Sequence, residues 1–305
     1  MPFWTSIMEV KRSSSLWTPC SKISAREEPT LPSDHENRSP NVYVDTHCHI
    51  YQSPLCDRIE KVAHRFACAG VQQCLVPAYD RQSWDQMPTQ LAHDRYFSAY
   101  GIHPWLANEY QGLEQRGEII NDLRPHLDKP RALAIGEIGL DTKTDSSTLA
   151  NQIPLLESQL ELALNLNLPV ILHCRGAFDT LLSILANHNH KIRGVLHAYT
   201  RGPELGQQLI NAGLHLGFGG HITRPEAKRA CLSAAALPLD RFVLETDAPN
   251  IALAGIPAEQ VEPAHIPLIA QAMADLRNVS LKTIADATTA NARALFKLPK
   301  LESTN

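Results

Sequence analysis

The sequence predicts an α/β protein built as a (β/α)8 TIM barrel, in which eight parallel strands alternate with helices. Short apolar runs of β type recur eight times from residue 42 onward, at intervals of roughly 20 to 40 residues. Amphipathic stretches at helical spacing lie between these runs, and residues of metal-ligand type follow several of them. Strands and helices in this alternation close as a barrel.

The strands come first in each predicted unit. They cover residues 42–46, 73–78, 97–101, 131–136, 169–173, 194–197, 214–218 and 242–246. Between the first two strands, Leu55, Ile59, Val62 and Phe66 recur at helical spacing. The last two helices, predicted over residues 264–276 and 281–296, complete the outer ring.

A doubly wound open sheet is the competing architecture. It would need a glycine-rich phosphate-binding turn after its first strand. The residues at that point are Cys48, His49, Ile50 and Tyr51, and the chain contains no G-x-G-x-x-G motif. The barrel is therefore the better interpretation.

The first 40 residues differ in composition from the rest. Pro19, Pro29, Pro32 and Pro40 interrupt every candidate period, which predicts a disordered N-terminal extension. The basic, serine-containing start of this segment is also compatible with an organelle transit peptide, but a plain tail is the simpler interpretation. We expect a single barrel domain over residues 41–299 and a short tail over residues 300–305.

Composition limits the possible partners and the compartment. The formal net charge is −4, so the chain has no overall basic field to hold a long nucleic acid. No apolar run approaches the ~18 residues that a membrane span needs, so we expect no membrane partner, and no obligate protein partner is evident. The seven cysteines include no C-x-x-C pair and are expected to be thiols in a reducing, cytoplasmic setting.

The most informative residues lie where predicted strands end. Barrel enzymes carry their catalytic groups at the carboxyl ends of the strands, so these residues are expected to meet at one rim. The candidate ligands are His47 and His49 after the first strand, Glu137 after the fourth, His173 and His197 at the ends of the fifth and sixth, and Asp247 after the eighth. One such histidine alone is more often a packing residue, and one carboxylate alone is often a helix cap. Together they favour a metal centre.

Four imidazoles and two carboxylates suit one or two divalent ions such as Zn²⁺, Mn²⁺ or Mg²⁺. The economical arrangement has two ions, because six ligands are many for one catalytic ion that must keep an open position. In this arrangement Glu137 bridges the ions. His47, His49 and Asp247 complete one site, and His173 and His197 complete the other.

Six motifs follow one another along the chain: His47-x-His49, Gly101-Ile102-His103-Pro104, Gly136-Glu137-Ile138-Gly139-Leu140-Asp141, Pro169-Val170-Ile171-Leu172-His173, Gly194-Val195-Leu196-His197 and Leu244-Glu245-Thr246-Asp247-Ala248-Pro249. In this order they resemble the signatures of the TatD family of metal-dependent deoxyribonucleases, in the amidohydrolase superfamily. The run from Gly219 to Pro225 resembles the YjjV-like branch in particular. The resemblance implies a TIM barrel, a divalent-metal centre and hydrolysis of phosphoester bonds, with trimming of DNA or RNA 3′ ends as the activity.

The expected reaction is attack on phosphorus by a metal-bound hydroxide, with Asp247 as proton acceptor and Glu137 as the second catalytic carboxylate. The substrate would be a nucleic-acid end or a small phosphoester. The alternative is a C–N or C–O hydrolase acting on an amide, a lactone or an aminoacyl-tRNA ester with the same centre. A superfamily cousin bridges its metals with a carboxylated lysine, but Glu137 occupies that place here, and Lys143 lies beyond the strand. A metal-free scaffold protein is the remaining rival, and no ligand is missing to favour it.

Two further residues are assigned to substrate binding. His103 ends the third strand and would point over the site, although rim packing is the alternative. Arg175 follows His173 by two residues and could clamp a phosphate with its planar guanidinium, or could form a surface salt bridge instead. Cys48 and Cys174 neighbour ligands and are expected to face away from them as packing residues. The family pattern is not followed at Gln260-Val261 or over residues 198–202, which leaves the substrate preference open.

Overall fold

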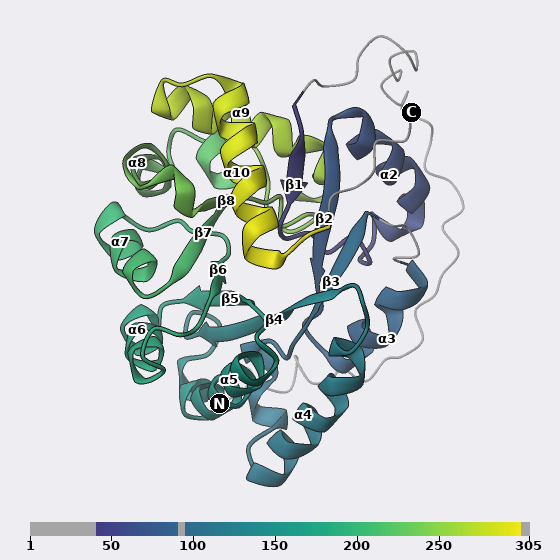
Figure 1. Cartoon of the computed structure of the whole chain (residues 1–305), viewed down its shortest axis with the longest axis vertical. Helices are drawn as coiled ribbons and strands as arrows, with labels where there is room; N and C mark the ends of the chain where they lie inside the picture. Colours follow the sequence, from purple (N-terminus) through teal and green to yellow (C-terminus); the bar gives the residue numbers. More distant parts are fainter. Residues whose placement is uncertain (1–40, 91–94, 300–305) are drawn as a thin grey trace, which may run out of the picture. The chain divides into compact units, whose positions relative to one another are not determined.

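The computed structural model describes residues 41–90 and 95–299, so the expectations for residues 1–40 and 300–305 lie outside the described residues. Its centre is one eight-stranded parallel sheet with strand order β1 to β8 (Figure 1). The strands are β1 (Tyr43–Asp45), β2 (Val71–Pro77), β3 (Tyr96–Tyr100), β4 (Ala132–Asp141), β5 (Val170–Arg175), β6 (Gly194–Leu196), β7 (Leu214–Phe218) and β8 (Phe242–Leu244).

Backbone hydrogen bonds between the ends of the first strand, β1, and the last strand, β8, close the sheet into a barrel. The Thr46 amide donates to the Leu244 carbonyl at 3.0 Å, and the Asp247 amide donates to the His47 carbonyl at 2.8 Å. A parallel bridge between Cys48 and Ala248 continues this seam. The predicted (β/α)8 barrel is confirmed.

Helices surround the strands in Figure 1. They are α2 (Ile59–Cys68), α3 (Arg81–Gln90), α4 (Leu113–Leu127), α5 (Leu149–Leu166), α6 (Phe178–Asn187), α7 (Pro203–Asn211), α8 (Lys228–Ala236), α9 (Ile266–Arg277) and α10 (Leu281–Phe296). No helix within residues 41–90 and 95–299 is both long and apolar enough to cross a membrane.

The core has two parts. The larger lies between the strands and the helices, as the amphipathic pattern predicted. The smaller contains strand residues such as Ile171, Val195 and Val243, and Leu295 and Phe296 of α10 pack against it. Side chains alternate along a strand, so residues two positions beyond Ile171 and Val195 also point into the barrel. This alternation positions His173 on β5 and His197 directly after β6.

Strand β4 differs from its prediction, since it continues to Asp141 rather than ending at Gly136. Glu137 therefore lies within the strand and not after it. The register with β5 shifts between Ile135 and Ile138, so the alternation along β4 changes at Glu137. A single-sequence period cannot detect such an irregularity.

Gly139 allows β4 to approach β5 closely. Its φ is +149°, and a Cβ there would collide with the His173 carbonyl oxygen. We expect Gly139→Ala to lower the free energy of unfolding by about 3 kcal/mol, because neither backbone can move without breaking the sheet. The matched control is Gly117→Ala in α4, where a Cβ meets nothing within 4 Å. That substitution should stabilise the protein by about 1 kcal/mol, since alanine is the better helix former. Urea unfolding of both variants tests the pair, and equal effects would contradict it.

Candidate metal centre

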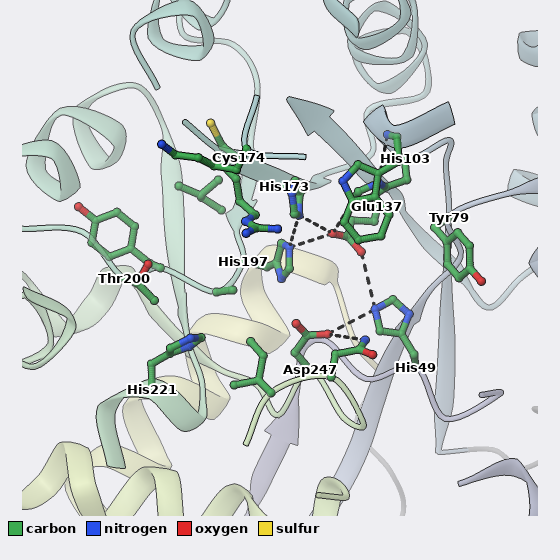
Figure 2. Close-up of a pocket in the computed structure, with 18 of the residues that line it drawn as sticks. His49, Tyr79, His103, Glu137, His173, Cys174, His197, Thr200, His221 and Asp247 are labelled. Atoms are coloured by element: carbon green, nitrogen blue, oxygen red, sulfur yellow. Dashed lines mark hydrogen bonds and ion pairs between the residues drawn. The ribbon is translucent and has the colours of Figure 1, made fainter. Parts of the chain in front are cut away.

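The six candidate ligands all lie at the carboxyl ends of the strands. Figure 2 shows His49, Glu137, His173, His197 and Asp247 directed toward one another in the pocket. His173 follows Ile171 by two residues on β5, so strand alternation turns it inward. Asp247 lies three residues past the end of β8 with a φ of +49°, and its amide is held by the His47 carbonyl, so the turn after the strand sets its direction. All six side chains are buried.

One group of donor atoms comes from β1, β4 and β8. The Nε2 atoms of His47 and His49 are 3.1 Å apart. The Asp247 Oδ1 atom lies 3.4 Å from Nε2 of His49 and 3.7 Å from Nε2 of His47. Glu137 Oε2 lies 3.4 Å from Nε2 of His47. Tetrahedral ligands at about 2.1 Å from a cation are about 3.4 Å from one another, so this group fits a divalent ion.

The second group faces the other oxygen of Glu137. Its Oε1 atom lies 3.0 Å from Nδ1 of His173 and 2.9 Å from Nε2 of His197. These two nitrogens are 3.2 Å apart. The carboxylate of Glu137 therefore stands between the two groups, with one oxygen toward each, as a bridging ligand would.

Hydrogen bonds on the far side of two rings decide which nitrogen carries the proton. The Tyr51 hydroxyl donates to the Pro77 carbonyl at 3.2 Å and so accepts from Nδ1 of His49, also at 3.2 Å. On His173, Nε2 lies 3.1 Å from the Asp141 carboxylate, which can only accept when ionised. Each neutral ring therefore directs its lone pair inward, where a cation would be coordinated.

His103 has the opposite arrangement. Its Nδ1 accepts from the Trp105 amide at 3.3 Å, so in the neutral ring the proton is on Nε2. That Nε2 lies 3.4 Å from Glu137 Oε1. His103 therefore lies beside the ligands, and not only over the site as the sequence predicted. It can donate to an oxygen of Glu137 or of a bound anion, but it offers no lone pair to a cation in this tautomer.

Two further buried acidic residues, Asp45 and Glu245, form hydrogen bonds with the backbone next to the ligands. Asp45 accepts from the Thr246 amide at 3.0 Å, from the Thr246 hydroxyl at 2.6 Å and from the His47 amide at 3.2 Å. It thereby joins the ends of β1 and β8. Glu245 accepts from the Ala198 amide at 2.5 Å and lies 3.9 Å from Nδ1 of His197. Glu245 lies within a quoted motif and Asp45 lies two residues before one, but their roles depend on contacts across the barrel.

The electrostatics favour positive charge at the centre. Burial, together with nearby His197, lowers the pKa of His47 to about 4. Burial alone would raise the pKa of Asp247, but contact with His49 and the positive charges that the neighbouring imidazoles carry in acid lower it to about 2. Burial also opposes ionisation of Glu137, yet His197, His103 and His47 hold its pKa well below the usual range. At neutral pH the first group thus offers two ionised carboxylates and a neutral His47, which suits a divalent cation. In the second group burial would lower the pKa of His197, but the charge of Glu137 raises it to about 10, so a cation bound there displaces the proton of this ring.

Five of the six ligands, all except His47, line a pocket of about 760 Å³. Three cationic side chains contribute to its lining, namely Lys143, Arg175 and Arg201. Arg175 is 55% exposed and lies 3.6 Å from the Asp141 carboxylate, so it reaches the pocket as predicted while also forming the alternative salt bridge. The Arg201 guanidinium lies over the Phe178 ring at 5.1 Å.

Sequence analysis missed Asp141, Trp105, Arg201 and Phe178. Asp141 ends a quoted motif four residues after Glu137, and this spacing was the available signal. Arg201 lies in the segment that does not follow the family pattern. Cys48 and Cys174 both belong to the buried core, as expected, and Cys174 also contributes to the pocket lining.

Residues 44–297 match the family described as TatD related DNase. The uncharacterized metal-dependent hydrolase YjjV of Escherichia coli K12 is 32% identical over 260 residues, which cover 84% of this chain and 98% of that protein. Its crystal structure superposes with a TM-score of 0.76.

Two further proteins place this likeness in context. The 3′-5′ ssDNA/RNA exonuclease TatD of Erwinia billingiae is 35% identical over 251 residues, which cover 79% of this chain and 93% of that protein. A dihydroorotase of Campylobacter jejuni covers 86% of this chain and 85% of its own, with a TM-score of 0.55 and 12% identity. At that identity the likeness concerns the fold alone.

Proposed function

This chain belongs to the family of TatD related DNases, and on that premise we propose that it is a metal-dependent phosphodiesterase that removes nucleotides from the 3′ ends of single-stranded DNA or RNA. The expected family membership is confirmed. The observation that carries the proposal is Glu137, whose two oxygens face two separate groups of imidazole and carboxylate donors. The Erwinia relative named as a 3′-5′ exonuclease supports the choice of substrate.

We propose that the site holds two divalent ions. His47, His49 and Asp247 would hold one, His173 and His197 would hold the other, and Glu137 would contact both. When bound, such ions lower the pKa of water and neutralise charge on phosphate oxygens. The mixed nitrogen and oxygen donors suit Zn²⁺ or Mn²⁺ better than Mg²⁺, which prefers oxygen alone.

The residues of the chain have separate roles in this proposal. The carboxylate of Asp247 accepts the proton of the attacking water, and the side-chain amide of Asn250, 3.3 Å from Oδ1, orients this carboxylate. His103 donates its Nε2 proton to an oxygen of the scissile phosphate. The Arg175 guanidinium binds the same phosphate from the β5 side of the pocket. Asp247 and His103 are buried, which keeps bulk water from them, whereas Arg175 and Asn250 are exposed at the pocket mouth.

Pocket size and charge support a preference for ends. A volume of about 760 Å³ lies within the roughly 300–1,000 Å³ that holds a single small ligand. The net charge of −4 provides no extended basic surface for a long strand. Binding is then confined to one or two nucleotides. We also propose a reducing, cytoplasmic setting, because the six described cysteines are free thiols.

We expect chelation to abolish turnover and Mn²⁺ or Zn²⁺ to restore it. In this proposal the divalent ions, and no side chain, lower the pKa of the attacking water. The test uses 3′-labelled and 5′-labelled oligonucleotides, an aminoacyl-tRNA, and simple amide and lactone substrates. Release of mononucleotides from the 3′ end is the expected result. Turnover of the carbonyl substrates with intact oligonucleotides would overturn the phosphodiesterase proposal, whereas cleavage of circular DNA would overturn only the preference for ends.

A further inference from the structure

Trp105 is unusual among the aromatic residues of the barrel. Its side chain is 56% exposed and contributes to the lining of the pocket. In residues 41–87 and 95–299, every other Trp, Tyr and Phe side chain is buried or half-buried. A large apolar ring left in solvent at the mouth of a binding pocket needs an explanation other than core packing.

The exposed ring is nevertheless held in place. Its Nε1–H donates to Asp141 Oδ2 at 2.9 Å, and its ring meets the edge of His103 with centroids 4.3 Å apart. The His173 ring lies 6.2 Å away at 71°. Three contacts of this kind orient the indole before any ligand binds, which reduces the entropy that binding must overcome.

The same carboxylate also positions a cation. Asp141 Oδ2 lies 3.6 Å from the Arg175 guanidinium, and through its bond to Nε2 of His173 it contacts a metal-centre ligand. One carboxylate thus organises an aromatic face, a guanidinium and a ligand imidazole.

A nucleotide has the complementary pair of features, an aromatic base and a phosphate. Single-stranded nucleic acids bind on exposed aromatic rings with cations nearby, and stacking tolerates any base because every base has a π face. We propose that Trp105 is the stacking platform for the base of the terminal nucleotide, while Arg175 holds its phosphate. This inference rests on the proposed function and adds the contact that recognises the base.

The experiment compares two oligonucleotides, one ending in a normal 3′ nucleotide and one ending in an abasic residue. The measured quantity is the ratio of kcat/KM for the two substrates. Stacking on Trp105 should give the natural protein a ratio of roughly ten or more, carried mainly by KM. Trp105→Ala and Trp105→Leu should reduce the ratio to near one, whereas Trp105→Phe should retain most of it because the ring is kept. The matched control is Leu113→Ala, an exposed residue outside the pocket, which should leave the ratio unchanged.

The phenylalanine variant separates stacking from support of Asp141. It keeps an aromatic face but loses the indole N–H, so a ratio near one in Trp105→Phe would mean that the residue only holds Asp141, and the proposal would be overturned. An unchanged ratio in Trp105→Ala would overturn it as well. Metal content and melting temperature of each variant show whether the centre is intact.

Failure of the proposed function is distinguishable from failure of this inference. If the natural protein cleaves neither oligonucleotide, the exonuclease proposal fails, and stacking is then tested by fluorescence titration in chelator. Two results together support the platform. The normal oligonucleotide quenches tryptophan emission more strongly than its abasic counterpart does, and this difference is lost in Trp105→Leu. Equal quenching in the natural protein and Trp105→Leu overturns it.

Discussion

Glu137→Gln is expected to lower kcat/KM by at least roughly 10³-fold and to reduce the content of bound divalent metal. The substitution keeps the shape of the side chain but removes the charge that faces both donor groups, at 3.4 Å from His47 and 2.9 Å from His197. An amide nitrogen directed at one group cannot accept or coordinate as a carboxylate oxygen does. Metal analysis of the purified protein and steady-state rates measure the two effects.

The control for this prediction is Glu161→Gln, the same change on the exposed face of α5, which should leave both quantities unchanged. Full metal content together with full rate in Glu137→Gln would show that the carboxylate is not part of the centre. Loss of rate with full metal content would place Glu137 in the reaction but not in metal binding.

Asp247→Asn is expected to lower kcat by roughly 10³-fold even at saturating metal, the size typical of a lost general base. The amide keeps the volume and the position of Oδ1 but cannot take a proton. Since the pKa of Asp247 is lowered to about 2, the carboxylate is ionised throughout the neutral range, and the loss should persist across it.

Metal titration separates the two roles of Asp247. If excess metal restores the full rate to Asp247→Asn, the residue is a ligand only and the proton-acceptor assignment is wrong. The exposed Asp128, at the C-terminal cap of α4, provides the control, and Asp128→Asn should behave as the natural protein.

Local pattern predicted the repeating units well because each strand and helix contributes its own apolar face. Strand β7 and helix α10 match their predicted bounds, and β8 and β1 are shorter than predicted by one or two residues at their ends. The prediction was wrong at β4, which continues five residues past Gly136. There the strand depends on pairing with β5 through Gly139, a contact between segments more than 30 residues apart.

The sequence by itself determined which residue types meet at the rim, because in a parallel barrel every strand end lies on the same side. Six separate motifs in order were sufficient to indicate the family and its metal chemistry. The sequence could not determine which nitrogen of each imidazole carries the proton, because this depends on the hydrogen-bond partner that each ring meets in the folded protein. Nδ1 of His103 accepts from the Trp105 amide, whereas Nε2 of His173 donates to Asp141.

Only the tertiary structure decided that Asp141 connects Trp105, Arg175 and His173, since these residues come from three different strand ends and converge only when the barrel closes. The physical reason is that strand periodicity specifies the face on which a side chain lies. Hydrogen bonds between faces of different strands depend on register, twist and local irregularities such as the shift after Ile135, and these arise from pairing over long sequence separations.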